Sequence, residues 1–242
     1  MRTRTLLLAG ALSLAGLATS LAQSNVYSLN VVGYYNLVLP PQNPGPGLSL
    51  IANQLDLDGT GNNNTLQTVF GSPSQLPNLS KIFLFDTVAG AFNAQVNVIG
   101  GNYTGSAAAL AAANAAMKPG RGVFVQIPLA VVTPTTITIV GNVLQGTLTT
   151  PILAFSPALQ LVSSQVPQQA TIDTLGLTLG VGAVGKLFQW QAQKNAPGQN
   201  YLQKNALANG TWAGGAPTLD VGEAAFLAAP AGSSWTRNFT VQ

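Results

Sequence analysis

The feature of this sequence that most constrains its fold is an internal repeat. Short motifs in the first part of the chain return in the same order in the second part, about 100 residues later. The motifs are apolar runs bounded by Gly, Pro or Asn, which is typical of strands rather than helices. The first copy contains Val31-Val32-Gly33, Leu48-Ser49-Leu50-Ile51, Lys81-Ile82-Phe83 and Gly120-Arg121-Gly122-Val123-Phe124-Val125, and the second contains Ile139-Val140-Gly141, Leu159-Gln160-Leu161-Val162, Lys186-Leu187-Phe188 and Gly222-Glu223-Ala224-Ala225-Phe226-Leu227.

We therefore expect an all-β fold built from two antiparallel sandwich-like or barrel-like modules related by a pseudo-twofold axis. The first repeat covers residues 23–132 and the second covers residues 133–242. Few polar residues separate them, so we expect the two repeats to pack together. The exception to the strand pattern is an alanine-rich stretch over residues 107–117, which predicts one short helix with Ser106 as its N-cap.

The strand that opens each repeat has a third version at the end of the chain, where residues 237–241 resemble it. Two copies with three opening strands allow two arrangements. The terminal strands either pair with each other and close the fold, or one of them adds to the sheet edge of a neighbouring subunit. We favour closure within the chain.

The first 22 residues have the pattern of a secretory signal peptide. Arg2 and Arg4 precede an apolar stretch over residues 6–17, and small residues lead to a cleavage site between Ala22 and Gln23. The apolar stretch is shorter than the ~20 residues that a membrane-spanning helix needs, and no later stretch is long enough either. We expect a secreted protein, either extracellular or held at the cell surface.

The composition favours self-association and argues against nucleic-acid binding. Charged residues make up 6% of the chain, whereas soluble domains usually have about 25%. Removal of the leader leaves seven basic and six acidic residues, without the basic clusters that nucleic acids require. A surface with so few charges repels copies of itself weakly.

Residues suited to catalysis are scarce. The chain has no His and no Cys, and Asp220 with Glu223 is the one close acidic pair in the second repeat. Because Lys118 and Arg121 stand at the matching places in the first repeat, we interpret the acidic pair as turn residues, with a carboxylate-based glycosidase as a minor alternative. The segment 180–186 resembles a phosphate-binding loop, but a strand pattern follows it where a helix is required.

A weak calcium-binding pattern follows the strand expected at residues 48–52 of the first repeat. Asp56, Asp58, Thr60 and Asn62 place oxygen-bearing side chains at alternate positions, but Gln67 stands where a calcium loop has its bidentate Glu. A turn rich in Asn and Gly explains the same residues. Calcium is the one cofactor that the sequence suggests.

Two groups of aromatic residues stand out in the sequence. Tyr34, Tyr35, Tyr103, Tyr201 and Trp212 have no counterpart in the other repeat, and we expect them on loops, where aromatic rings among amide side chains can stack on sugar rings. Six others align between the repeats and are expected to fill two equivalent cores: Phe83, Phe85 and Phe124 in the first, and Phe188, Trp190 and Phe226 in the second.

The ordered motifs also resemble a known family. The segments are Val31-Val32-Gly33-Tyr34, Leu48-Ser49-Leu50-Ile51-Ala52-Asn53-Gln54-Leu55, Lys81-Ile82-Phe83-Leu84-Phe85 and Pro119-Gly120-Arg121-Gly122-Val123-Phe124-Val125. They are similar to the VVGY, FSLIANPL, IYKW and PGEGFFV motifs of a family of uncharacterised secreted proteins that is abundant in verrucomicrobial genomes. The resemblance implies export and a duplicated β module, and it implies no site residues.

From these observations we expect an exported, non-catalytic protein that acts as a structural, self-associating or adhesive component of the cell surface or extracellular matrix. The expected partner is a second copy of the chain. The alternative is a carbohydrate-binding module, with an extracellular glycan as the partner and Tyr34, Tyr35, Tyr201 and Trp212 as the binding residues.

Overall fold

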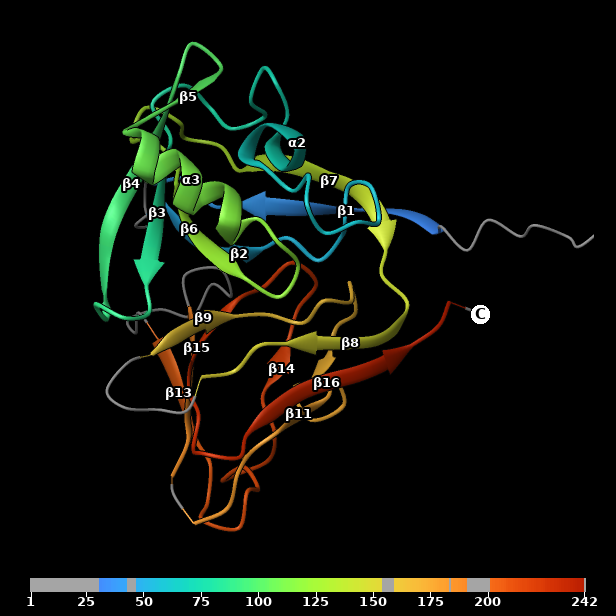
Figure 1. The fold of residues 1–242 in the computed structure, drawn as a ribbon. Helices are drawn as coiled ribbons and strands as arrows, with labels where there is room; N and C mark the ends of the chain where they lie inside the picture. The colour runs from blue at the N-terminus through green and yellow to red at the C-terminus, as the bar shows by residue number, and fades with distance from the viewer. Residues whose placement is uncertain (1–30, 43–46, 154–158, 183, 191–200, 242) are drawn as a thin grey trace, which may run out of the picture.

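The chain folds into two halves, which lie one above the other in Figure 1. In this computed structural model the described residues are 31–42, 47–153, 159–182, 184–190 and 201–241. They form mainly antiparallel strands, so the all-β expectation is confirmed. Among the described residues, no helix combines the length and the apolar character that crossing a bilayer requires.

In its described residues, the first half contains two sheets and two helices. Strands β1 and β7 pair to form what we call the β1–β7 ribbon, and a second sheet has the strand order β2-β6-β3-β4-β5. Helix α3 packs over β3, β4 and β6. The bounds are β1 (Val31–Leu39), β2 (Leu48–Ala52), α2 (Leu66–Phe70), β3 (Lys81–Asp86), β4 (Ala91–Ile99), β5 (Asn102–Thr104), α3 (Ala107–Ala116), β6 (Gly122–Gln126) and β7 (Thr135–Val143).

The second half contains three sheets in its described residues. Their strand orders are β11-β16-β8, β13-β12-β15-β9 and β10-β14. The bounds are β8 (Gly146–Thr150), β9 (Gln160–Val162), β10 (Ala170–Thr171), β11 (Leu177–Thr178), β12 (Lys186–Trp190), β13 (Tyr201–Asn205), β14 (Thr218–Leu219), β15 (Ala225–Ala228) and β16 (Ser234–Phe239).

The two largest sheets have the same strand order. Strands β2, β6, β3 and β4 of the first half correspond to β9, β15, β12 and β13 of the second. The registers also correspond, because Phe83 pairs with Phe124 in one sheet and Phe188 pairs with Phe226 in the other. We call two residues equivalent when they occupy corresponding places in these two registers.

The alanine-rich helix lies where the sequence places it. Ser106 caps α3 by accepting a hydrogen bond from Ala109 N, and Ala109 and Ala113 are buried against the sheet. The prediction of a single helix is wrong, because Thr65 caps a second, shorter helix, α2. Five residues are too few to show a helical period in a sequence.

Each half is closed by pairing between its own first and last strands. The first strand, β1, pairs with β7, and the last strand, β16, pairs with β8. The expectation that the two terminal strands pair with each other is therefore wrong, although both pair within the chain. Strand β7 lies in the segment assigned to the second repeat, yet it belongs to the first half by its pairing and by the burial of Ile137 and Ile139 in the first core.

The halves meet through reciprocal backbone contacts. Ala52 N donates to Gly222 O at 2.8 Å, and Ser163 N donates to Gly120 O at 3.0 Å. The β-bridges Ile51 to Glu223 and Val162 to Arg121 repeat this exchange. The edge strands β2 and β9 are thus each covered by a turn of the other half, in the manner of a pseudo-twofold interface.

Buried apolar side chains form three clusters, of which the third joins the halves. Alternate residues of each strand face opposite sides of the sheet. Ile82 and Leu84 face the core of the first half, and Leu187 faces the core of the second. The six aligned aromatic residues lie on the opposite side of each strand, where they form a cluster shared by the two halves. The expectation that they fill two separate cores is therefore wrong.

Candidate functional site

The most distinctive feature of the junction between the halves is its aromatic cluster. Trp190 pairs across its hairpin with Tyr201, and Phe85 pairs across the equivalent hairpin with Phe92. Tyr201 therefore has a counterpart, Phe92, which the sequence alignment missed. Edge-to-face contacts cross the junction, with ring centroids 5.2 Å apart for Phe124 and Trp190 and 4.9 Å apart for Phe85 and Phe226.

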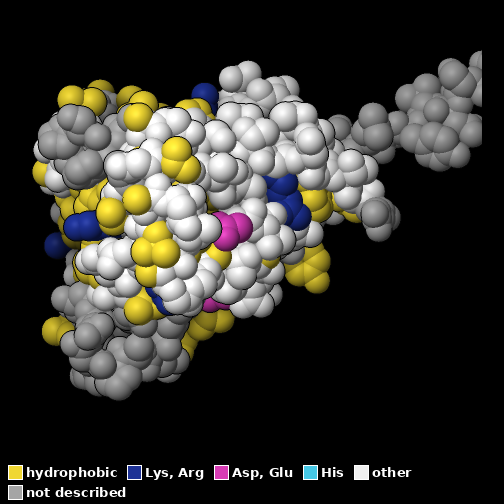
Figure 2. Space-filling model, turned by 90° about the horizontal axis from the view of Figure 1, so that it is seen from below, with side chains coloured by type: hydrophobic (Ala, Val, Ile, Leu, Met, Phe, Trp, Pro, Cys, Tyr) yellow, Lys and Arg dark blue, Asp and Glu magenta, His cyan; other side chains and the backbone are white. Residues whose placement is uncertain are grey.

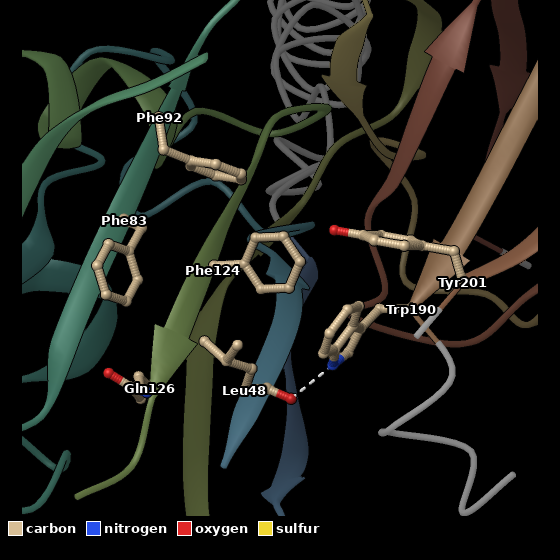
Figure 3. Close-up of a pocket in the computed structure, with 7 residues that line it drawn as sticks. All are labelled: Leu48, Phe83, Phe92, Phe124, Gln126, Trp190 and Tyr201. Carbon is tan, nitrogen blue, oxygen red and sulfur yellow. Dashed lines mark hydrogen bonds between the residues drawn. The ribbon is translucent and has the colours of Figure 1, made fainter. Parts of the chain in front are cut away.

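A first pocket opens into this cluster. Its volume is about 320 Å³, within the range of small-ligand sites. Trp190 Nε1 donates a hydrogen bond to Leu48 O at 2.7 Å, which fixes the indole of one half to the backbone of the other (Figure 3). The lining residues are Leu48, Phe83, Phe92, Phe124, Gln126, Trp190 and Tyr201.

A second pocket of about 330 Å³ adjoins the first, and both share Phe92 and Tyr201 as walls. Its other lining residues are Phe85, Gly90, Ala91, Leu159, Phe188 and Phe226. Six of its walls have an equivalent in the first pocket, since the shared residues Phe92 and Tyr201 are equivalent to each other. The equivalent pairs are Leu48 and Leu159, Phe83 and Phe188, Phe124 and Phe226, Trp190 and Phe85, and Tyr201 and Phe92.

The polar groups of the pockets are few. Tyr201 extends from β13 toward Phe124, with its hydroxyl at the tip of the ring (Figure 3). Within the described residues, neither the Tyr201 hydroxyl nor the Gln126 side-chain amide has a hydrogen-bond partner. Burial raises the pKa of the Tyr201 hydroxyl, so this group remains a neutral donor at physiological pH. No acidic or basic side chain is among the described residues that line either pocket.

The structure separates the other tyrosines that the sequence proposed for ligand binding. Tyr34 lies on β1 with 74% of its surface exposed, away from the pockets. Tyr35, its neighbour on the opposite face, is buried. Its hydroxyl donates to Ala52 O at 2.9 Å and accepts from Gln54 N at 3.0 Å, and burial raises its pKa. Tyr34, Tyr35 and Tyr201 all lie in strands, so the expectation that they lie on loops is wrong.

Trp212 does not line the junction pockets either. It is buried in the core of the second half, and its Nε1 donates to Asp173 Oδ1 at 2.9 Å. Tyr103 lies on β5, and its hydroxyl donates to Gly71 O and bonds to Ser74 Oγ. Of the aromatic residues proposed for ligand binding, Tyr201 alone lines the junction pockets.

The predicted calcium loop is held by its own hydrogen bonds. Asp56 is fully buried and accepts from Asn64 Nδ2 at 2.5 Å and from Gly61 N at 2.8 Å. Asp58 is partly exposed and accepts from Thr60 N and Thr60 Oγ1, which lowers the pKa of its carboxyl.

The backbone N of Asn62 donates to Thr60 Oγ1 at 3.3 Å, so Asp58, Thr60 and Asn62 belong to one exposed turn while Asp56 faces inward. No group of three or more His, Cys, Asp or Glu side chains suited to a metal was found in the described part of the chain. The four residues are not arranged as one set of ligands, and calcium binding stays a prediction.

The acidic pair of the second half forms a turn. Glu223 Oε2 accepts from Asp220 N at 2.8 Å, and Glu223 Oε1 accepts from Gln189 Nε2 at 3.0 Å. Lys186, at the end of segment 180–186, begins strand β12 (Lys186–Trp190), at the place where a phosphate-binding loop is followed by a helix. These contacts agree with the structural interpretation of both motifs.

Comparison with known proteins adds no relative: no family model, curated protein or solved structure matches the chain. The resemblance to the verrucomicrobial family therefore stays a prediction from the motifs.

Proposed function

We propose that this chain is an exported, non-catalytic β protein that self-associates as a structural or adhesive component of the cell surface or extracellular matrix. The observation that carries the proposal is the uncharged outer face of the β1–β7 ribbon. No Asp, Glu, Lys or Arg occurs in either strand. Figure 2 shows a surface with the same character, because charged side chains form only small patches among polar and apolar ones.

The outer face of the ribbon exposes an unusual amount of apolar surface. Val32, Tyr34 and Val38 project from β1 with 68%, 74% and 63% of their surface exposed. Val140, which is 52% exposed, stands opposite Tyr34 on β7. Contiguous exposed apolar residues on a strand pair commonly mark a protein interface.

The two edges of the β1–β7 ribbon differ in whether a further strand can pair with them. The outer edge of β7 is partly occupied, because the Gln75 side chain donates to Thr138 O and accepts from Thr138 N, and Asp56 exchanges backbone hydrogen bonds with Asn142. Strand β1 pairs with β7 alone among the described strands. A second copy would therefore add at the β1 edge, where no charged residue opposes pairing.

The test is light scattering of residues 23–242 over a concentration series, with Val38→Lys as the disrupting variant. A Lys at this position places charge on the ribbon face and should reduce the average mass at a given concentration. Val88→Lys is the matched control, since Val88 is 91% exposed on the turn between β3 and β4. A wild-type chain that stays monomeric at its highest soluble concentration would overturn the proposal.

A second candidate function is carbohydrate binding at the junction pockets. It is favoured by Tyr201, whose hydroxyl lies among aromatic walls without a partner in the described residues, and by the Gln126 amide in the same pocket. Sugar rings offer an apolar face for stacking together with hydroxyl groups for hydrogen bonds, which suits this mixture.

A glycan array tests this candidate, with Tyr201→Ala as the pocket variant. Loss of the wild-type signal in this variant is the expected result. Tyr34→Ala is the matched control because Tyr34 is exposed outside the pockets, so the same substitution there should leave binding unchanged. Equal loss in both variants, or no signal from the wild type, would contradict carbohydrate binding at this site.

A further inference from the structure

We propose that the two junction pockets form one bipartite site for a neutral glycan chain, in which each pocket holds one sugar ring. The inference rests on the carbohydrate-binding candidate above and adds the class of ligand and its minimum length. It follows from the relation between the two pockets, from their charge, and from one difference between them.

The pockets are two versions of the same structure. Each combines a Leu and two Phe residues from one half with two aromatic residues from the other half. Their volumes, about 320 and 330 Å³, are nearly equal. Since Phe92 and Tyr201 are walls of both, the pockets lie side by side, and a ligand with two adjacent and similar groups can occupy both at once.

The walls select an uncharged ligand. No charged side chain occurs among the described residues that line the pockets. A uronic acid or a sulfated sugar would have to place its charge beside aromatic rings without a compensating cation, which is costly. Phe92, at the shared wall, is 43% exposed, so the site borders solvent and the outer hydroxyl groups of a neutral sugar can remain hydrated.

The pockets differ in their polar groups. The first pocket contains the Gln126 amide and the Trp190 ring, whereas the second has Gly90 and Ala91 and no amide side chain. The first pocket can therefore orient a sugar by hydrogen bonds, while the second offers mainly apolar contact. We infer that the first pocket holds the anchoring ring and that the second adds affinity through the linked neighbour, as a tethered contact does.

Isothermal titration with two neutral oligosaccharide series, glucose to cellohexaose and N-acetylglucosamine to chitohexaose, tests the inference. For at least one series, wild-type affinity should rise about tenfold or more from the monosaccharide to a chain that reaches both pockets. A wild type that binds a series with the same affinity at every length would overturn the bipartite site and leave carbohydrate binding standing. A wild type that binds neither series would overturn carbohydrate binding as well.

Two variants separate the pockets. Ala91→Phe places a large ring at the second pocket from an exposed strand end, and should abolish the gain in affinity with chain length. Gln126→Ala removes the amide of the first pocket and should weaken every length by about tenfold. Thermal unfolding of both variants checks that they fold. A folded Ala91→Phe protein that keeps the full gain with length would overturn the proposal.

Discussion

The two halves contain equivalent large sheets but cover the inner face of each sheet, the face opposite the junction, in different ways. In the first half, helix α3 lies on the sheet and contributes the small side chains Ala109 and Ala113. In the second half, the core contains Trp212 and Trp235, and Trp235 Nε1 donates to Leu175 O at 2.8 Å. A helix with small side chains in one half, and large Trp side chains from outside any helix in the other, both bury the inner face, so these two kinds of cover are interchangeable.

The junction side of the sheets shows much less difference. Every aromatic residue of the cluster has an equivalent aromatic residue in the other half, and the turns at Gly120 and Gly222 exchange equivalent hydrogen bonds. Each half must fit the other here, and a change on one side has to be met on the other. The comparison teaches that the junction constrains the sequence more tightly than the separate cores do.

The largest effect is expected from the two equivalent phenylalanines at the centre of the junction. Phe124→Ala and Phe226→Ala should each lower the free energy of unfolding by about 4 kcal/mol, since both residues are 4% exposed and their loss leaves a cavity. Urea unfolding measures the loss. Clearly unequal losses in the two variants would break the equivalence of the halves.

A smaller effect is expected at the junction turns. Gly222 has φ 72°, and a Cβ there would overlap Leu37 Cδ2 and lie 2.9 Å from Tyr35 Cε2. Gly222→Ala should lower the free energy of unfolding by about 3 kcal/mol, from backbone strain and crowding together.

Gly214→Ala isolates the backbone strain, because Gly214 also has φ 72° but no atom within 4 Å of an added Cβ. It should cost about 1 kcal/mol. Equal costs for Gly214→Ala and Gly222→Ala in thermal unfolding would mean that the turn at Gly222 is not tightly packed against β1.

The smallest effect tests the element that only the first half has. Ser106→Ala removes the cap of α3 and should cost about 1 kcal/mol, while Ser106→Thr keeps the hydroxyl and should cost less. All three Trp residues of the chain lie in the second half, so Trp fluorescence reports its unfolding.

If the junction couples the halves, the unfolding transition of Ser106→Ala shifts equally whether it is followed by Trp fluorescence or by circular dichroism. A shift in circular dichroism with an unchanged Trp transition would show that the halves unfold separately.

Much of the fold could be predicted from the sequence, because apolar runs between turn residues identify strands such as β2, β3 and β12. The pairing partners of the terminal strands could not be predicted from the sequence. The sequence shows that three similar strands exist, but their pairing depends on which segments the chain brings together. The segment 135–150 supplies β7 to one half and β8 to the other, and no local pattern marks this division.

The candidate site was predicted in part. The alternation in β3 and β12 separates Phe83 from Ile82 and Phe188 from Leu187, but apolar residues occur on both faces of these strands. The alternation therefore cannot tell which face is a core and which is the junction. Phe92 was missed because the chain from Phe85 to Phe92 is shorter than that from Trp190 to Tyr201, so only strand pairing reveals the equivalence.

The pairing of β1 and β16 with the middle of the chain brings two strand ends to one side of the molecule. Val31 pairs with Val143 and Phe239 pairs with Gly146, on either side of the short connection between β7 and β8. In Figure 1 both ends lie on the right, while β3, β4 and β13, which carry walls of the pockets, lie on the left. A tether attached before Val31 or after Phe239 would leave from the same side, and would hold the pockets on the side away from its anchor.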